Sequence, residues 1–304
     1  MSSDKRGTLI VIVGATGSGK TDLSIELAEH FSAPVISTDS RQVFRGMPIG
    51  TAQPSAEQLS RAKHYFIADR DITAEYNAGI FEKEALALLA ELFAVHDYVI
   101  AVGGSGLYID ALCRGFDEFP ETDRALRTSL EDIVRHNGLA PLLAELRELD
   151  PDYYAQVDRD NPARVIRAVE VCRQTGKPYS GQRKGYVAER PFRIIKIGID
   201  MPRAELYARI DRRVELMMQA GLESEARSLY PNKQLNALQT VGYKELFDYF
   251  DGEYTLDRAV ELIQRNSRRY AKRQLTWFRR DPEIEWFARE DKKKMIFFIE
   301  KFGG

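Results

Sequence analysis

The sequence of 304 residues contains few cysteines and histidines and no long apolar run. Its two cysteines, Cys113 and Cys172, lie far apart and form no C-x-x-C motif, so we expect buried thiols in a reducing compartment rather than a disulfide or metal site. The four histidines are scattered without ligand spacing, which argues against a histidine metal site. No apolar run approaches the ~20 residues of a membrane span, and residues 1–6 do not resemble a secretory signal. We therefore expect a cytoplasmic protein without a membrane segment.

Positive charge is scarce over much of the chain and concentrated near its end. The formal net charge is −2, but residues 69–160 hold 8 basic and 20 acidic side chains. Residues 258–280 hold 8 basic side chains, and Glu261 is the only acidic one among them. A solvated helix face is one explanation of this basic segment. We favour the other, a surface for a polyanion, because the charge is of one sign.

The strongest motif is a phosphate-binding loop near the start of the chain. It matches G-x-x-x-x-G-K-[ST] at every fixed position and consists of Gly14, Ala15, Thr16, Gly17, Ser18, Gly19, Lys20 and Thr21. Residues 8–13 before it are typical of a buried strand, and the residues after it have helical spacing. The glycines let backbone N–H groups face an anion, Lys20 adds a full positive charge, and the Thr21 hydroxyl can hold Mg²⁺. The motif predicts a di- or triphosphate ligand.

Two further segments are predicted to reach the same crevice, because ligands of open α/β sheets bind beyond the carboxyl ends of the strands. Asp39 follows the predicted strand at residues 34–37, where a carboxylate can accept a proton or organise metal-bound water. A turn or helix-capping role is the alternative for this aspartate. The predicted strand at residues 98–102 ends in two glycines and Ser105. It lacks the Mg²⁺-binding aspartate that a nucleoside triphosphatase carries there.

The order of strands and helices predicts an α/β fold, in which a parallel sheet of the P-loop NTPase type is flanked by helices. Residues 119–190 show helical stretches and no strand of this sheet, so we expect an all-helical insertion domain between two parts of the core domain, residues 1–118 and 191–304. Residues 45–58 are expected to be an irregular surface segment. A long helix is expected at residues 256–280, with the basic residues facing outward and one stripe packing inward. This stripe consists of Leu256, Val260, Ile263, Ser267, Tyr270 and Gln274.

Seven segments of the sequence together resemble the bacterial tRNA dimethylallyltransferases, also called isopentenyl-diphosphate:tRNA transferases. They occur in family order over almost the whole chain and read GATGSGKT at 14–21, STDSRQVF at 37–44, GMPIGTAQP at 46–54, AVGGSGLY at 101–108, NPARVIRAVEV at 161–171, VGYKE at 241–245 and AKRQLTWFRR at 271–280. The resemblance implies a P-loop sheet whose helical insertion grips the anticodon stem of tRNA. It also implies transfer of a dimethylallyl group from dimethylallyl diphosphate to N6 of the adenosine 3′ of the anticodon. The sequence shows no sign of an obligate protein partner.

The resemblance also implies roles for individual residues. Asp39 is expected to be the general base, Ser105 to act through a hydroxyl where relatives usually have threonine, and Arg213 to contact the diphosphate. The donor diphosphate is expected on the loop at residues 14–21, with Mg²⁺ as cofactor at Thr21. The implied contacts to the tRNA anticodon stem-loop are Asp39, Ser40, Arg41, Gln42, Ser105, Arg127, Ala163, Arg164, Val165, Ile166, Arg167, Arg273 and Gln274.

Besides Ser105, three positions depart from the family pattern. Ala15 stands for a usual proline, Phe44 for a usual tyrosine and Ala163 for a usual glutamine. The departure at Ala163 affects one of the implied RNA contacts, because alanine lacks the side-chain amide of glutamine.

Two other functions fit parts of the sequence. A small-molecule kinase of the phosphate-loop class would use Asp39 to activate a hydroxyl, but it leaves the basic helix and the insertion without a role. An RNA-binding module whose loop holds a nucleotide as a switch would bind tRNA without forming a product. Rapid ATP turnover is expected of the first and tRNA binding without chemistry of the second.

Overall fold

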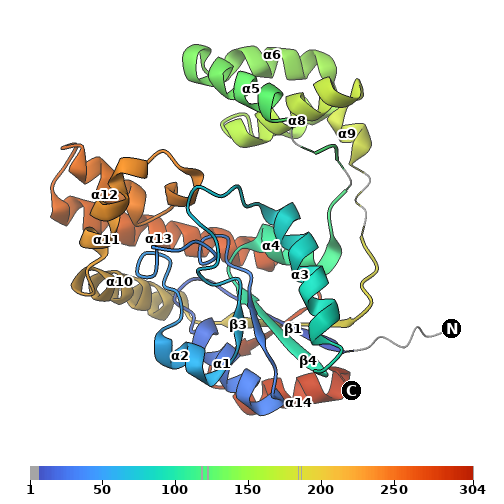
Figure 1. The fold of residues 1–304 in the computed structure, drawn as a ribbon, viewed down its shortest axis with the longest axis vertical. Helices are drawn as coiled ribbons and strands as arrows, with labels where there is room; N and C mark the ends of the chain where they lie inside the picture. The colour runs from blue at the N-terminus through green and yellow to red at the C-terminus, as the bar shows by residue number, and fades with distance from the viewer. Residues whose placement is uncertain (1–6, 118, 122, 184, 186, 304) are drawn as a thin grey trace. The chain divides into compact units, whose positions relative to one another are not determined.

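The computed structural model describes residues 7–117, 119–121, 123–183, 185 and 187–303. The chain forms two compact units, of which the first contains Met1–Cys113 and Glu189–Gly304 and the second is Arg114–Ala188. Sequence patterns place the ends of the insertion at residues 119 and 190, and the compact units divide a few residues earlier at both ends. The second unit appears in green and yellow in Figure 1.

The first unit is built on one sheet of six parallel strands in the order β3-β2-β4-β1-β5-β6. The strands are β1 Thr8–Val13, β2 Val35–Ser37, β3 His64–Tyr65, β4 Tyr98–Gly103, β5 Arg193–Asp200 and β6 Ile284–Ala288. Every residue of the central strand β1 is buried, as its unbroken run of apolar residues predicts for a strand covered on both faces. The expected α/β fold with a parallel sheet is confirmed.

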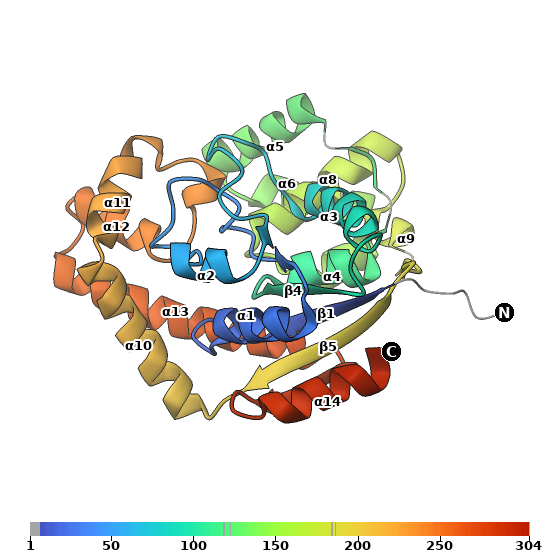
Figure 2. The same ribbon diagram turned by 60° about the horizontal axis from the view of Figure 1, so that its bottom comes forward.

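Helices cover both faces of this sheet (Figures 1 and 2). On one face, α1 (Lys20–Phe31) and α14 (Lys292–Gly303) share a core with strand residues. This core includes Leu23 and Leu27 from α1, Met295 and Ile299 from α14, and Ile10, Ile12, Ile100 and Ile197 from the strands. On the other face lie α3 (Ala78–Leu92) and α4 (Gly106–Arg114). The alternation of side chains along each strand makes both packings possible.

The functional edge of the sheet is where β1, β2 and β4 end. Val13 at the end of β1 pairs with Gly103 at the end of β4, and the Thr38 N–H beyond β2 donates to the Val102 carbonyl at 2.8 Å. In a parallel sheet all carboxyl ends lie at one edge. The phosphate loop, the Asp39 segment and the Ser105 segment therefore start side by side, although they are far apart in the sequence.

A group of helices follows β5 in the first unit. Their bounds are α10 Arg203–Gln219, α11 Leu222–Leu229, η1 Tyr230–Asn232, η2 Asn236–Leu238, α12 Tyr243–Phe250 and α13 Leu256–Phe278. The prediction that one stripe of α13 packs inward is only partly right. Ile263 and Gln274 are buried, but Ser267 and Tyr270 are half-buried and line a cavity. The periodicity correctly identifies the face of α13 that is turned away from solvent. Part of this face lines a cavity instead of packing in the core.

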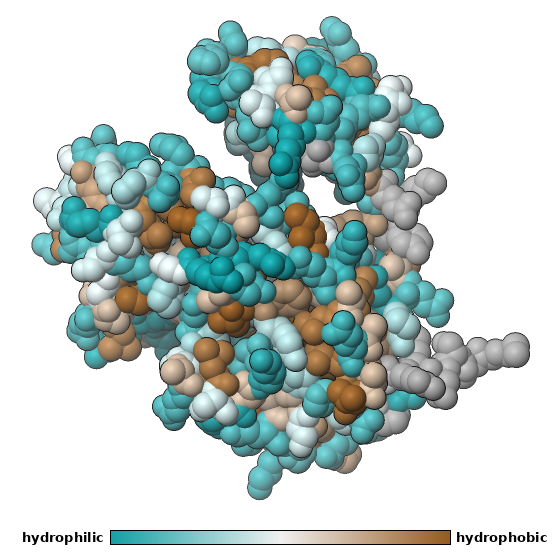
Figure 3. All heavy atoms as spheres, viewed as in Figure 1, coloured by the Kyte–Doolittle hydropathy of each residue, from teal (hydrophilic) through white to brown (hydrophobic). Residues whose placement is uncertain are grey.

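The second unit is helical over its described residues. Its helices are α5 Arg124–Asn137, α6 Ala140–Leu149, α7 Pro151–Gln156, α8 Pro162–Thr175 and α9 Tyr179–Gln182. They enclose a separate apolar core that includes Leu130, Leu142, Leu146 and Val165. Hydrophilic side chains cover most of this unit on the face shown in Figure 3. An apolar interior with a polar exterior is what a small independent helical unit requires.

Residues 45–58 are less irregular than the sequence analysis expects. The end of this stretch belongs to α2 (Ala56–Arg61), which starts with a capping box. The Ser55 hydroxyl accepts from the Gln58 N–H at 3.2 Å, and the Gln58 side chain accepts from the Ser55 N–H at 2.9 Å. Because α2 has no buried residue, apolar periodicity could not reveal it, but the S-x-x-Q pattern could.

Both cysteines are free and buried, as expected, and burial raises the pKa of the Cys113 thiol to about 12. None of the helices in the described ranges is long and apolar enough to cross a bilayer.

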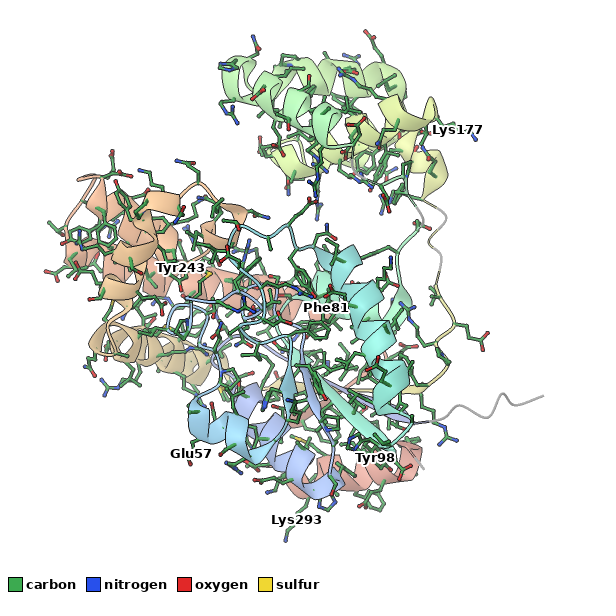
Figure 4. All side chains as sticks on the ribbon, in the orientation of Figure 1. Glu57, Phe81, Tyr98, Lys177, Tyr243 and Lys293 are labelled. Atoms are coloured by element: carbon green, nitrogen blue, oxygen red, sulfur yellow. The ribbon has the colours of Figure 1, made fainter. Side chains whose placement is uncertain are left out.

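A carboxylate fastens the loop at residues 46–54 to the helices after β5. Glu225 on α11 accepts the N–H groups of Ile49 at 2.9 Å and Gly50 at 2.8 Å, and also the hydroxyl of Tyr243 at 2.6 Å. Tyr243, labelled at the start of α12 in Figure 4, is fully buried and its ring lies against Gly50. A Cβ at residue 50 would lie 2.5 Å from that ring, so glycine is required by the close approach.

We expect Tyr243→Phe to lower the free energy of unfolding by about 1 kcal/mol, because it removes one buried hydrogen bond and keeps the ring. The measurement is equilibrium urea denaturation. Tyr249→Phe on the same helix is the matched control, because the Tyr249 hydroxyl has no hydrogen bond to the described residues. Equal losses in both variants would contradict the role of the Glu225 contact.

Candidate active site

A cavity of about 450 Å³ opens at the carboxyl ends of β1, β2 and β4. All the residues that line it belong to the first compact unit. The walls include Thr16, Lys20 and Thr21 from the phosphate loop, Asp39, Ser40, Arg41 and Gln42 from the segment after β2, Arg213 from α10, and Tyr270, Arg273 and Gln274 from α13. The structure thus brings part of the phosphate loop and most of the predicted acceptor residues of the core into one enclosure, whereas Ser105 and the predicted loop residues Gly14, Ala15, Gly17, Ser18 and Gly19 do not line it.

One end of the cavity carries two cations, Lys20 and Arg213. Burial and the nearby Arg213 guanidinium together lower the pKa of Lys20 to about 7, although the Asp39 charge opposes the shift. Burial also lowers the pKa of Arg213. Within the described ranges, neither cation has a carboxylate within 4.0 Å. Two cations that repel each other in a cavity form a binding site for an anion.

The helix behind these cations adds to the attraction. Helix α1 starts at Lys20 with Gly19 as its N-cap at φ +84°, and its N-terminus carries no side-chain cap. By contrast, Asn77, Asp123 and Thr255 cap α3, α5 and α13 through their side chains. An uncapped helix N-terminus leaves N–H groups and the positive end of the helix dipole for a ligand.

Asp39 is held by its own segment at another wall of the cavity. Its Oδ1 accepts the N–H groups of Arg41 at 2.9 Å and Gln42 at 3.4 Å, and its N–H donates to the Ser37 hydroxyl at 3.3 Å. The turn role considered from the sequence is therefore present. It does not compete with a chemical role, because the contacts use one carboxylate oxygen and the residue still lines the cavity.

Two serines join the segments after β2 and β4. The Ser40 N–H donates to Ser105 Oγ at 3.0 Å, and Ser105 Oγ donates to Ser40 Oγ at 3.2 Å. Tyr270 stands beside them, and burial together with the Asp39 charge raises the pKa of its hydroxyl to about 12. These hydroxyls form a neutral hydrogen-bonding surface next to the Asp39 carboxylate.

Comparison with known proteins decides the family. A model of the IPP transferase family matches residues 42–281, which is most of the chain. The chain belongs to the IPP transferase family. The tRNA dimethylallyltransferase 2 of Parabacteroides distasonis is 52% identical over 290 residues, 95% of this chain and 97% of that protein.

Two solved structures agree with this assignment. The tRNA isopentenylpyrophosphate transferase of Bacillus halodurans is similar at a TM-score of 0.71 and 38% identity, over 97% of this chain and 96% of that one. A eukaryotic dimethylallyltransferase acting on tRNA is similar at a TM-score of 0.80 and 25% identity, over 97% of this chain and 79% of that one. The family resemblance drawn from the sequence is confirmed.

Several groups of the phosphate loop that were expected to face an anion form hydrogen bonds within the protein instead. Ser18 is buried, and its N–H donates to the Ala15 carbonyl at 3.2 Å. The Thr16 N–H donates to Gln274 Oε1 at 2.8 Å, and Lys20 Nζ donates to the Ala15 carbonyl at 2.7 Å. The Thr16 N–H and the Ser18 side chain are therefore not directed at a ligand in this IPP transferase family member.

The family resemblance predicts Gln42 and Gln274 at tRNA, but their amides are engaged within the protein. Gln42 Oε1 accepts from the Ser37 hydroxyl, and Gln42 Nε2 donates to the carbonyls of Thr51 and Ala52. Gln274 Oε1 accepts from Thr16, and its Nε2 donates to the Gly104 carbonyl at 2.9 Å. These amides organise loops, while both residues also line the cavity, so their contact with tRNA stays a prediction.

The expected RNA residues of the second unit fall into three groups. Ala163 and Arg164 are exposed at the start of α8, whereas the Val165 and Ile166 side chains are buried in the helical core and cannot meet RNA. Arg127 and Arg167 each donate to Glu170 Oε2, at 2.9 and 2.8 Å, and remain about a quarter exposed. The consecutive positions 163–167 thus have different environments, because a helix turns successive side chains to different faces.

The basic helix α13 is also uneven. Arg265, Arg269, Lys272 and Arg273 are not buried, as expected, but Arg268 pairs with Asp211. Arg273 stacks over Tyr270 and lines the cavity. Tyr270 and the exposed Lys244 also line the cavity, and the sequence patterns did not predict them there. The family segment at residues 241–245 was the available signal for Lys244.

The lowered pKa of Lys20 predicts that diphosphate binding takes up a proton. Above pH 7 the free protein holds Lys20 mostly neutral, and a bound anion favours the charged form, so uptake approaches about one proton. Affinity should then fall by at most about tenfold for each pH unit above 7. We would measure inorganic diphosphate binding by calorimetry at pH 8 in buffers of different ionisation enthalpy. Lys20→Met serves as the reference for protons released by the ligand itself, and identical proton counts in both proteins would contradict the prediction.

Proposed function

We propose that this IPP transferase family member transfers a dimethylallyl group from dimethylallyl diphosphate to N6 of the adenosine 3′ of the anticodon in tRNA, with release of diphosphate. The observation that carries the proposal is the single cavity in which Lys20 and Arg213 form a cationic end and Asp39 supplies a carboxylate. Transfer of a dimethylallyl group needs an anion site for the diphosphate and a proton acceptor for the adenine N6, both close to the reacting carbon. The cavity supports both.

The donor diphosphate is assigned to the cationic end. Lys20, Arg213 and the N-terminus of α1 attract its negative charge, and the backbone N–H groups of Lys20 and Thr21 in the first turn of α1 supply further donors. A neutral exocyclic amine is a weak nucleophile, so the allylic C–O bond must be strongly polarised. Charges that stabilise the departing diphosphate do this most in the transition state, where the negative charge on it grows.

The site suits a Mg²⁺ ion that protein groups and the donor diphosphate hold together. Thr21 and Asp39 line the same cavity, while the described residues contain no cluster of three His, Cys, Asp or Glu that could hold a metal alone. Mg²⁺ commonly takes one or two protein ligands and completes its shell with phosphate oxygens and water. When bound, it neutralises charge on the leaving diphosphate. Thr21 is the residue assigned to hold it.

We assign Asp39 as the acceptor of the adenine N6 proton. The adenine N6 forms a bond to the first carbon of the donor, the bond from that carbon to the diphosphate oxygen breaks, and the N6 proton passes to the carboxylate. Because Oδ1 of Asp39 already accepts the N–H groups of its own turn, we assign Oδ2 as the acceptor atom. Ser40, Ser105 and Arg41 border the carboxylate and are assigned to hold the adenine.

The target adenine must leave the stacked anticodon loop to enter a cavity, which costs a few kcal/mol. Exposed cations offset this cost by binding RNA phosphates. We assign this role to Arg265, Arg269, Lys272 and Arg273 of α13, and to Arg127, Arg164 and Arg167 of the insertion, which is proposed to grip the anticodon stem. The exposed Ala163 is assigned an uncharged packing contact with the RNA. A tRNA-modifying activity and two buried free thiols both suit the expected cytoplasmic location.

The experiment that tests the function offers labelled dimethylallyl diphosphate and total tRNA to the full chain, with Mg²⁺. Label should enter adenosine, and diphosphate should be released in equal amount. ATP turnover without label transfer would instead favour the kinase, and tRNA binding without product would favour the RNA-binding switch.

We expect Asp39→Ala to cut the single-turnover rate by about two to four orders of magnitude while tRNA binding stays nearly intact, as for a lost general base. Asp71→Ala is the matched control, because Asp71 is exposed and its carboxylate accepts hydrogen bonds from Thr73 in its own turn, outside the cavity. A near-normal rate for Asp39→Ala would remove Asp39 from the chemistry.

The basic helix should contribute through phosphates. Replacing Arg265, Arg269 or Lys272 by alanine should lower the slope of log affinity against log salt by about one unit or less for each phosphate interaction removed, for cognate and non-cognate tRNA alike. Filter binding at several salt concentrations measures this slope. Lys293→Ala on α14, labelled in Figure 4, is an exposed control. If the α13 variants keep the parent slope, their charge is only a solvated face.

A further inference from the structure

We propose that Gln274 is a positioning residue that fixes the phosphate loop to the end of β4 from the RNA-facing helix α13. Its side chain is 6% exposed and spans two segments that are far away in the sequence. Oε1 accepts the Thr16 N–H at 2.8 Å, and Nε2 donates to the Gly104 carbonyl at 2.9 Å. The inference rests on the proposed donor site and adds a residue that determines its shape.

The surroundings are built to receive this amide. A Cβ at Gly104 would lie 2.1 Å from Gln274 Nε2, so the backbone after β4 can approach the amide only because residue 104 is glycine. Gly103, one residue earlier, has equally little room, because a Cβ there would lie 2.2 Å from the Thr38 hydroxyl oxygen. The end of β4 is therefore closed to side chains of its own, and a neutral amide from α13 stands beside the phosphate loop.

The same helix faces both substrates. Arg273 precedes Gln274 and lines the cavity, and Tyr270, one turn earlier, lies beside Asp39 and Ser105. Gln274 thus ties the loop assigned to the donor to the helix assigned to RNA. Loss of the tie should change the donor site first, because both atoms that the amide holds belong to the walls of that site.

The amide also decides what the loop offers to an anion. While Oε1 accepts the Thr16 N–H, that N–H is withdrawn from the ligand, and the backbone of the phosphate loop is held against α13. Restraining a loop in its binding shape raises affinity by reducing the entropy lost on binding. A carboxylate in place of the amide would add negative charge next to the diphosphate and could not donate to Gly104 when ionised.

The test compares Gln274→Met, which keeps the length, with Gln274→Glu, which adds charge. We expect the Kd of inorganic diphosphate, measured by calorimetry, to rise about tenfold for the first, the usual scale of one or two missing hydrogen bonds, and about a hundredfold for the second. The Kd of tRNA in filter binding should stay within about twofold. Gln264→Met is the matched control, since Gln264 lies on the same helix and its amide donates to the Asp211 carbonyl rather than to the phosphate loop.

Gly104→Ala provides a second route that leaves Gln274 in place. The added methyl displaces the amide, so the variant should reproduce the diphosphate defect of Gln274→Met, and the double variant should be no worse than either single one. Thermal denaturation of each variant separates loss of fold from loss of binding.

Two results would overturn the proposal. Diphosphate affinity that is unchanged or tighter in Gln274→Met would mean that the amide does not shape the loop, or competes with the anion for the Thr16 N–H. Weaker tRNA binding with normal diphosphate binding would make Gln274 an RNA contact instead. Both readouts are binding measurements, so they stay decisive even if the parent protein fails to transfer a dimethylallyl group, which would defeat the proposed function separately.

Discussion

The crowding of two positive charges, Lys20 and Arg213, beyond the end of β1 is the constraint on which the rest of the site depends. Burial and the repulsion from Arg213 lower the pKa of Lys20 to about 7, and the α1 N-terminus adds positive potential. Such an arrangement costs stability until an anion occupies it. The cost is tolerated because the sheet, covered by α1 and α14 on one face, holds the phosphate loop in place. A flexible scaffold would relax by moving the cations apart.

The cationic end of the cavity and Asp39 lie close together because of the sheet topology rather than because of local sequence. Parallel strands bring the ends of β1, β2 and β4 to one edge, so a cationic end and Asp39 share one cavity without a long loop between them. Glu225 and Gln42 then fasten the loop at residues 46–54 from two sides. Each fastening uses backbone N–H or C=O groups of the loop, so it does not depend on the side chains that the loop carries. The cavity wall is therefore stiff where substrate binding needs it.

Sequence reasoning reached the parts of this site that local patterns encode. The phosphate loop is a contiguous motif, and Asp39 follows a strand whose end must face the ligand edge. It did not foresee the internal hydrogen bonds of Gln42 and Gln274, because their partners are set by folding: Gln274 bonds to residues 258 and 170 positions away. Tyr270 was missed for another physical reason. A helical stripe marks covered positions, and periodicity alone cannot distinguish a packed core from a cavity wall.

The closed end of β4 bears on which chemistry the fold can run. Phosphoryl transfer in related folds places an aspartate at this strand end to hold the metal at the transferred phosphate. Here Gly103 lies against Thr38 and Gly104 against Gln274, so an acidic side chain has no room there. The proposed donor site instead offers cations and backbone N–H groups beside a neutral amide, and the carboxylate lies after β2 on the proposed acceptor side. Charge of this distribution stabilises a diphosphate that leaves as a whole, and puts the proton acceptor where the nucleophile arrives. The same phosphate loop is thereby suited to alkyl transfer.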